Sequence, residues 1–460
     1  MHITRDGTRT WQNVTPAALQ PWSRVNIIEA SPHDVATAYV AVNRYQLDDF
    51  RPYIYKTHDF GKTWQLSVNG IPSDTFVRTV REDPKRKGLL YAGTETGVYL
   101  SFDDGENWQS LQINLPVVPI TDLTIRDDDL IAATQGRAFW ILDDLTPLQQ
   151  MTDAAAAANA FLFTPRRTYR SRRAAFSTRP TEGIGQNPPG GVVVTYLLKA
   201  APAQPVTIEF LDRAGQPIQR FTSSGEAAAA PAVVERGTRG GTARPPVPAK
   251  LGMNRFEWDT RYPDGHGIEG GTFLAGGSLR GPQATPGTYQ VRLTVDGASV
   301  TREFEISKDP RLAATIDDYQ KQFDLLIAVR DKVSTAHDAV NEIRGLQQEM
   351  TAATKRAGNQ KVASAAATLN TKLEAVLYAL WEPRYTGFDD QMLLFDLKLN
   401  NRIVALQGYV SGHEGAPTDQ AQKVFAELSA ELDRLLAQLA DVKATELAAF
   451  RKLSGWAGRN

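Results

Sequence analysis

Residues 57–64 read THDFGKTW, and residues 101–108, which begin 44 positions later, read SFDDGENW. Each segment places a hydroxyl residue first, an aspartate third, a glycine fifth and a tryptophan eighth. A motif that returns in this form indicates a structural unit that returns with it. The defining residues are Thr57, Asp59, Gly61 and Trp64 in one motif and Ser101, Asp103, Gly105 and Trp108 in the other.

A damaged copy of the motif opens the chain. The segment TRDGTRTW keeps Thr4, Asp6 and Trp11, but Thr8 stands where the other copies have glycine. In such a turn an aspartate can accept hydrogen bonds from nearby backbone N–H groups, a glycine supplies a positive φ, and a tryptophan packs between sheets. Since a catalytic aspartate is not needed once per unit, we expect these residues to be structural.

Short β-rich runs surround the motifs in a constant order of strand, proline-containing turn, strand, break, strand, motif and strand. A unit of about 40 to 50 residues with four short strands is the period of a β-propeller blade. A third pass keeps three strands but has LDDL at 142–145 in place of the motif. We therefore expect residues 1–150 to form about three terminal blades. Closed propellers typically have about four to eight, so the remaining blades are expected from a missing N-terminal part or another chain.

The composition excludes several classes of protein. The chain has 460 residues, with 51 Lys and Arg against 52 Asp and Glu and no cysteine. This balance argues against a nucleic-acid partner, and the lack of cysteine excludes disulfides and thiolate sites. No apolar run reaches the ~18 residues of a membrane span, so we expect no membrane insertion. The start MHITRDGTRT lacks the features of a signal peptide.

Residues 151–189 read as a linker. An arginine cluster within it could clasp an anionic ligand, but a solvated linker that pairs with acidic loops is the preferred interpretation. The cluster comprises Arg166, Arg167, Arg170, Arg172 and Arg173.

Residues 190–308 return to period-two strands, as in an Ig-like β-sandwich. In this region we expect a disordered insertion near 223–250. One strand places four side chains on a single face, which we expect to belong to the core rather than to a sugar-stacking platform. These side chains are Phe256, Trp258, Thr260 and Tyr262.

Residues 311–460 are expected to form an α-helical bundle. Thr315 and Asp318 resemble a capping box, and apolar residues then follow at spacings of three and four as far as Met350, which predicts one long amphipathic helix. Further helices are expected near 361–381, 390–410 and 418–453.

No motif for nucleotide, cofactor or metal binding is present, and the six histidines show no ligand spacing. We therefore expect no cofactor and no metal. Carboxylate-pair chemistry stays open, because glycoside hydrolysis needs only two suitably separated acids. The acidic groups at 48–49, 127–129 and 143–144 are expected to be turn residues.

The motifs, the segment ATQGRAFWILDDLTPL, the later strands and the helical tail together resemble the C-terminal half of bacterial Asp-box (BNR-repeat) proteins. Members are called glycosyl hydrolase-like or sortilin-like, and their repeats are similar to those of xyloglucanases and sialidases. The resemblance implies an extracellular or periplasmic protein. It also implies candidate binding residues Gln135, Arg137 and Trp140, although the family usually has histidine at the position of Gln135.

Two functions remain open. The chain could bind a glycan or peptide ligand and give structural support, with no catalytic residue of its own. Alternatively, it could belong to a glycoside hydrolase that uses a carboxylate pair on the propeller. An acid pair in a cleft, with one pKa raised, would distinguish the second function from the first.

Overall fold

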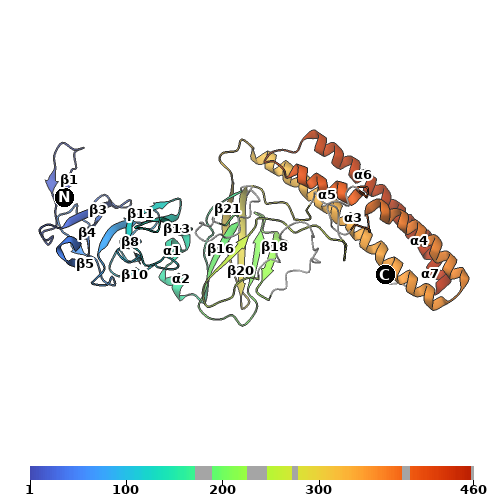
Figure 1. The fold of residues 1–460 in the computed structure, drawn as a ribbon, viewed down its shortest axis with the longest axis horizontal. Coiled ribbons are helices and arrows are strands. Elements are labelled where there is room, and N and C mark those ends of the chain that lie inside the picture. The colour runs from blue at the N-terminus through green and yellow to red at the C-terminus, as the bar shows by residue number, and fades with distance from the viewer. Residues whose placement is uncertain (171–188, 225–245, 272–277, 386–393, 457–460) are drawn as a thin grey trace. The chain divides into compact units, whose positions relative to one another are not determined.

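The computed structural model describes residues 1–170, 189–224, 246–271, 278–385 and 394–456. The chain divides into two compact units, Met1–Ala157 and Ala158–Asn460. The first unit consists mainly of β-sheets, and the second combines sheets with a C-terminal helical region (Figure 1).

Three antiparallel sheets follow one another through the first unit, after a short N-terminal hairpin (Figure 1). Within each sheet the strands lie in chain order, which confirms the predicted succession of strands. The hairpin is β1 (His2–Ile3) and β2 (Gln12–Asn13). The first sheet is β3 (Arg24–Ala30), β4 (Ala38–Arg44), β5 (Asp49–Thr57) and β6 (Gln65–Leu66), with the short helix η1 (Tyr45–Leu47) between β4 and β5. The second is β7 (Val77–Glu82), β8 (Leu90–Thr94), β9 (Val98–Ser101) and β10 (Gln109–Ser110).

Within the described part of the chain, the third sheet has three strands, β11 (Ile120–Arg126), β12 (Asp129–Thr134) and β13 (Phe139–Leu142). Where the other sheets continue into a fourth strand, the chain enters α1 (Thr146–Gln150) and α2 (Asp153–Ala157). The residues of the second and third sheets can be matched one to one, because equivalent backbone hydrogen bonds recur in both. The N–H of Asp104 donates to the carbonyl of Gly88 at 2.9 Å, and the N–H of Leu145 donates to the carbonyl of Asp128 at 2.7 Å. We call this correspondence the shared register. Leu145 thus occupies the position of Asp104.

Apolar side chains form the core between successive sheets. One cluster joins the N-terminal segment to the first sheet, a second joins the first sheet to the second, and a third joins the second to the third. Burying these faces is the main stabilising contribution, at roughly 25 cal/mol per Å² of apolar surface. Of the predicted turn residues, Asp48, Asp127, Asp128 and Asp144 have a positive φ, as expected of turns. Asp49 and Asp129 instead begin the strands β5 and β12, which corrects the expectation for these two.

Two further sheets enclose one core in the second unit. Trp258 and Phe210 stack at its centre with ring centroids 4.3 Å apart. The predicted core face is confirmed, since Phe256, Trp258 and Thr260 are buried and Tyr262 packs against the cluster. One sheet has the order β14 (Ala160–Leu162), β16 (Val192–Leu198), β19 (Gly252–Trp258). The other has the order β15 (Thr168–Arg170), β21 (Ala298–Lys308), β20 (Gly287–Val295), β17 (Thr207–Leu211), β18 (Pro217–Thr222).

Part of the predicted linker 151–189 belongs to these sheets. β14 pairs with β16, and β15 pairs in parallel with β21. Arg170 is consequently buried rather than solvated, which corrects the interpretation of the arginine cluster for this residue. Residues 171–188 of the predicted linker, with Arg172 and Arg173, and residues 225–245 of the predicted insertion lie outside the described residues.

The helical region begins at the predicted capping box. The Thr315 hydroxyl accepts from the N–H of Asp318, and the Asp318 carboxylate accepts from the N–H of Thr315. One long helix follows, as expected. The helices are α3 (Ile316–Ala357), α4 (Gln360–Leu380), α5 (Leu399–Val410), α6 (Asp419–Val442) and α7 (Ala448–Ser454), with a π-helical turn, η3, at Lys443–Leu447.

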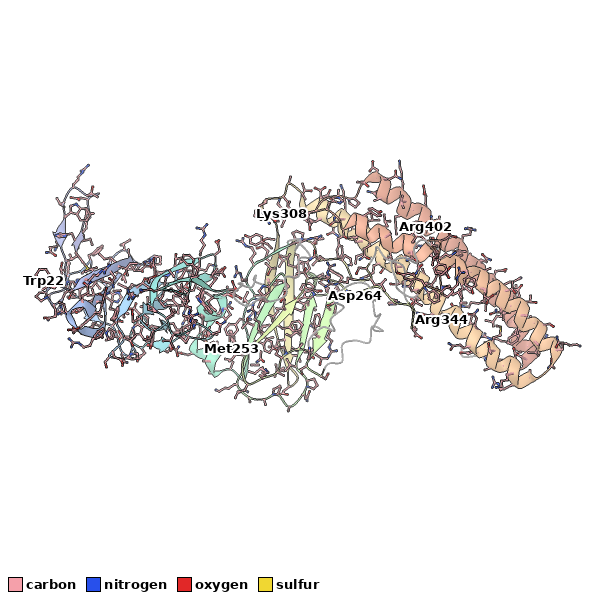
Figure 2. All side chains as sticks on the ribbon, viewed as in Figure 1. Trp22, Met253, Asp264, Lys308, Arg344 and Arg402 are labelled. Carbon is pink, nitrogen blue, oxygen red and sulfur yellow. The ribbon has the colours of Figure 1, made fainter. Side chains whose placement is uncertain are left out.

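Two helical predictions need correction. The helix expected at 390–410 begins only at Leu399, because residues 394–398 are not helical. The helix expected at 418–453 is interrupted by the π-helical turn. Side-chain contacts join the helices: Arg402 of α5 pairs with Glu431 of α6 at 3.0 Å, and the guanidinium of Arg344 lies over the ring of Trp381 (Arg344 and Arg402 in Figure 2).

A buried contact set joins the sheets of the second unit to its helices. The guanidinium of Arg170 lies 3.4 Å from the carboxylate of Glu414, donates to the side-chain oxygen of Gln322 at 3.0 Å, and lies over the ring of Tyr319. Both members of the ion pair are buried, and burial lowers the pKa of Arg170. We refer to the Arg170–Glu414 pair as the buried clamp.

Candidate functional site

The aspartate of the motif at 57–64 is engaged by its own turn. Oδ1 of Asp59 accepts from the Thr57 hydroxyl and the Thr63 N–H, each at 2.9 Å, and Oδ2 accepts from the Thr63 hydroxyl at 2.7 Å. The Thr57 hydroxyl oxygen accepts from the Gly61 N–H at 2.9 Å. The bonds from Thr63 lower the pKa of Asp59 to about 2. A carboxyl group held in this way stays ionised and is unsuited to act as a general acid near neutral pH.

The other two motifs repeat this geometry. Asp103 accepts from the Ser101 hydroxyl at 2.8 Å and from the backbone and side-chain N–H groups of Asn107 at 2.9 and 2.8 Å. Partial burial raises the pKa of Asp103, but the bonds from Asn107 and Ser101 together lower it below its usual value. Asp6 accepts from the N–H and the hydroxyl of Thr10, which lower its pKa to about 2.

Each motif tryptophan lies against the preceding sheet where one is present. The indole N–H of Trp64 donates to the carbonyl of Val14 at 2.8 Å, and that of Trp108 donates to the carbonyl of Ser67 at 3.2 Å. Trp108 is 5% exposed. Trp11, whose motif has no preceding sheet among the described residues, is 57% exposed. The tryptophan thus joins a sheet to the one before it.

One polar network brings together groups that the sequence did not single out. Thr37 Oγ1 lies 2.9 Å from His58 Nδ1, and His58 Nε2 lies 3.0 Å from Asp104 Oδ2, an order of hydroxyl, imidazole and carboxylate also found in nucleophilic enzymes. However, the Thr37 hydroxyl donates its single proton to Asp34 at 2.6 Å, and Thr37 is buried. This hydroxyl is therefore not placed to attack a substrate.

Asp104 is the centre of that network and joins the first two sheets. Its Oδ1 accepts from the Tyr39 hydroxyl at 2.5 Å, and its backbone carbonyl accepts from the ammonium of Lys56 at 2.9 Å. Lys56, itself buried, also pairs with Glu106 at 2.5 Å. Burial and the bond to Asp104 raise the pKa of Tyr39. Each charge has a counter-charge, so the arrangement is suited to holding sheets together.

Of the candidate binding residues, Gln135 and Arg137 lie in the turn between β12 and β13, and Trp140 lies in β13. Gln135 and Arg137 are exposed, and the indole N–H of Trp140 donates to the Arg137 carbonyl at 3.1 Å. The backbone therefore brings Arg137 and Trp140 together. The Gln135 N–H donates to the carbonyl of Pro119 at 2.9 Å. Of the three side chains, that of Trp140 lines a cavity.

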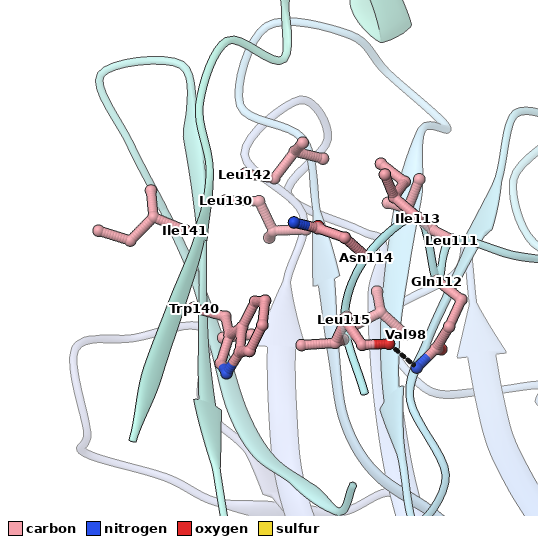
Figure 3. Close-up of a pocket in the computed structure, with 11 residues that line it drawn as sticks. Val98, Leu111, Gln112, Ile113, Asn114, Leu115, Leu130, Trp140, Ile141 and Leu142 are labelled. Carbon is pink, nitrogen blue, oxygen red and sulfur yellow. Dashed lines mark hydrogen bonds between the residues drawn. The ribbon is translucent and has the colours of Figure 1, made fainter. Parts of the chain in front are cut away.

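This cavity lies between the third sheet and the loop that follows β10 (Figure 3). One wall is the face of β12 and β13, and the other is the loop, where the Gln112 side chain is held by the Leu115 carbonyl at 2.7 Å. The space free of protein atoms is about 420 Å³ including the open mouth. The lining is mostly apolar: Val98, Leu111, Gln112, Ile113, Asn114, Leu115, Leu130, Ala132, Trp140, Ile141 and Leu142.

The cavity was not expected from the sequence. One feature of the sequence could have indicated it, because the third repeat keeps its strands but lacks the tryptophan that packs against the preceding sheet in the second repeat. Across the described residues, no group of three His, Cys, Asp or Glu side chains is placed to hold a metal ion. The described helices include none that is both long enough and apolar enough to cross a membrane.

No family model matches the chain, and no curated protein matches it. Among solved structures, it is similar to YCF48 bound to D1 peptide, with 20% identity over 31% of this chain and 44% of that one, at a TM-score of 0.25. It is also similar to an ancestral GH74 enzyme, with 22% identity over 25% of this chain and 14% of that one, at a TM-score of 0.21.

A third similar structure is the GH74 enzyme of Niastella koreensis, with 10% identity over 62% of this chain and 46% of that one, at a TM-score of 0.22. The chain spans less than half the length of each of these three proteins.

Proposed function

We propose that the three sheets of the first unit are blades of a β-propeller, and that the chain is a non-catalytic, protein-binding part of an exported Asp-box protein. In this proposal the outer face of the third sheet binds a further sheet of the same kind, supplied by another polypeptide. The second unit gives structural support.

The observation that carries the proposal is a difference in exposure between equivalent residues. By the shared register, Phe139 and Ile141 of the third sheet occupy the positions of Val98 and Leu100 in the second. Val98 and Leu100 are each 3% exposed beneath the third sheet, whereas Phe139 is 75% and Ile141 is 56% exposed. Large apolar side chains gathered on one face favour a protein contact.

Adjacent residues extend this surface. Ile131 pairs with Ile141 and Ala133 pairs with Phe139, so the four side chains lie on one face of the sheet. We call them the outer face. The second sheet provides the model for what covers it, because its corresponding face is covered by the next sheet. A sheet-like partner is therefore the occupant that fits this surface best.

The carboxyl groups give no support to the hydrolase alternative. A general acid in a glycosidase needs a raised pKa. Among the described residues, the Asp and Glu side chains whose pKa departs from its usual value all have it lowered. We expect the purified chain to release no reducing sugar from xyloglucan, other β-glucans or sialosides.

Sedimentation velocity tests the protein-binding proposal, with a second copy of the chain as the available sheet-bearing partner. We expect the native chain to associate as its concentration rises, and Phe139→Asp to abolish the association. Val35→Asp is the matched control, because Val35 is 88% exposed in the same unit but lies outside the outer face. A native chain that stays monomeric up to ~100 µM, or equal loss in both variants, would contradict the proposal.

A further inference from the structure

We infer that the cavity and the free edge of β13 form one binding site for an extended Trp-Gln segment of a separate polypeptide. This inference rests on the proposed protein-binding function and names a second surface for it. The outer face lies on one side of the third sheet, whereas the cavity lies on the side that faces the second sheet.

Equivalent hydrogen bonds locate the site. The N–H of Ser67 donates to the carbonyl of Ile54 at 2.8 Å after β6, and the N–H of Leu111 donates to the carbonyl of Val98 at 2.8 Å after β10. Ser67 and Leu111 therefore have equivalent positions. The carbonyl of Ser67 is the group that accepts the indole N–H of Trp108 from the next sheet. The corresponding group beside the third sheet is the carbonyl of Leu111, a residue that lines the cavity.

The cavity wall also matches the surroundings of Trp108. In the core between the first and second sheets, Trp108 packs in a cluster with Leu90, Ala92 and Tyr99. By the shared register, the corresponding residues of the third sheet are Leu130, Ala132 and Trp140. All three line the cavity. The third sheet thus keeps the walls of a tryptophan site, while the segment that supplied the tryptophan in the second sheet has no counterpart there.

The strand next to the cavity has a free backbone edge. β13 pairs only with β12 among the described residues. The N–H of Thr134 donates to the carbonyl of Ala138, and in an antiparallel pair the hydrogen-bonded residues alternate along the strand. Phe139 and Ile141 therefore direct their N–H and C=O groups away from β12. Their counterparts Val98 and Leu100 pair with the segment that follows Trp108.

The occupants of the equivalent positions define the ligand. The three motifs continue as Trp11-Gln12, Trp64-Gln65 and Trp108-Gln109, and in each case the glutamine begins the last strand of its hairpin or sheet. A ligand of the same kind would insert its indole into the cavity, donate the indole N–H to the Leu111 carbonyl, and pair its backbone with β13. Strand addition of this type gains affinity from the backbone and specificity from the side-chain pocket.

Binding of a labelled peptide to the full chain tests the site. The probe is fluorescein-SFDDGENWQSLQ, which copies residues 101–112, and the readout is fluorescence anisotropy. We expect saturable binding that weakens at least 10-fold when the peptide tryptophan is replaced by alanine. Equal binding of the two peptides, or no binding to the folded native chain at concentrations up to 1 mM, would overturn the inference.

Two variants of the protein separate the pocket from the edge. Ala132→Leu narrows the cavity, so it should weaken binding of the tryptophan peptide at least 10-fold and leave binding of the alanine peptide unchanged. Ile141→Pro removes an N–H from the free edge, a position where proline is tolerated. It should therefore weaken the binding of both peptides. Ile141→Val keeps that N–H and is the control. Circular dichroism and thermal melting verify that each variant is folded, and retained binding in both folded variants would refute the site.

The outcome is distinguishable from that of the proposed function. Ile131→Asp changes an outer-face side chain of β12 that neither lines the cavity nor belongs to the free edge of β13, so it should abolish self-association while peptide binding persists. A chain that binds the tryptophan peptide but stays monomeric contradicts the outer-face proposal alone. A chain that self-associates through Phe139 but binds both peptides equally contradicts the peptide site alone.

Discussion

The second and third sheets begin alike and end differently. Both have three antiparallel strands in a common register, but the second continues through SFDDGENW into β10, whereas the third continues through LDDL into α1. The first outcome gives a buried tryptophan and a paired edge. The second leaves a cavity and an edge that no strand of the described residues pairs with. One eight-residue turn therefore decides whether a sheet of this kind is completed.

The cause lies at two positions of the motif. Leu142 takes the place of Ser101, so the hydroxyl that accepts the glycine N–H is missing. Thr146 takes the place of Gly105, which has a φ of +80°. The N–H and hydroxyl of Thr146 instead bond to the carboxylate of Asp144, at 3.1 and 2.6 Å, and the helix starts there. Serine and glycine form the turn of the second sheet, and in the third sheet, where both are absent, a helix with proline in its first turn follows instead.

The largest effect is expected at the tryptophan that completes the second sheet. Trp108→Ala removes a buried indole from between two sheets and should lower the free energy of unfolding by about 3 to 5 kcal/mol. Trp11→Ala removes the exposed equivalent and should change it by about 0.5 kcal/mol or less. Urea unfolding measures both. Similar losses at the two sites would mean that the tryptophan acts within its own turn rather than against the preceding sheet.

The motif glycine should show the next largest effect. Gly105→Ala places a Cβ in a backbone of positive φ and 2.2 Å from Ser67 Oγ, which donates to the Gly105 carbonyl. We expect a loss of about 2 to 3 kcal/mol from the strained φ and the displaced hydrogen bond. Gly7→Ala is the control, since its φ is +70° but a Cβ there would meet no atom within 4 Å. Its cost should be about 1 kcal/mol, and equal costs would contradict the role of close packing.

The damaged motif offers the reverse experiment. Thr8 holds a φ of +76° at the glycine position, without a glycine's freedom. Thr8→Gly should therefore stabilise the N-terminal hairpin by up to about 1 kcal/mol, partly offset by the greater entropy of glycine in the unfolded chain. Slower hydrogen exchange of the Thr10 amide, which bonds to Asp6, would report the gain. Faster exchange would show that the threonine side chain contributes more than its backbone strain costs.

The smallest effect is expected on the stability of the folded chain at low pH. The pKa of Asp59 is about 2 in the folded chain against an ordinary 3.8, so its ionised form stabilises the turn. This contribution is fully present above pH 3.8 and is lost as the pH falls towards 2. Asp59→Asn should flatten the dependence of the urea midpoint on pH in that window. A pH dependence of the urea midpoint that is unchanged in Asp59→Asn would contradict this role of the carboxylate.

Much of the fold could be predicted from the sequence because local patterns determine it. The recurring motif indicated the four-stranded sheets, and the spacing of apolar residues after Thr315 indicated α3. The position of Arg170 could not be predicted in the same way. Its surroundings come from Gln322 and Glu414, which are distant in sequence, and an arginine among four others reads as a solvated charge.

The candidate site was predictable only in part. The resemblance pointed to Trp140, which does line the cavity. The opposite wall comes from the loop after β10, and no pattern in that loop signals an opening. The cavity becomes intelligible once the register shows that its wall corresponds to the surroundings of Trp108. A pocket that arises from a missing segment leaves no motif of its own in the sequence.

The buried clamp has a consequence for the order of events during synthesis. Its two members, Arg170 and Glu414, are 244 positions apart, and a ribosome adds about 5 to 20 residues each second. Arg170 therefore emerges about 12 to 50 s before its partner exists. Until Glu414 is synthesised, the charged guanidinium of Arg170 at the end of β15 lacks this counter-charge, so its burial gains little free energy. The contact between the sheets and the helices of the second unit can therefore be completed only after nearly the whole chain has been synthesised.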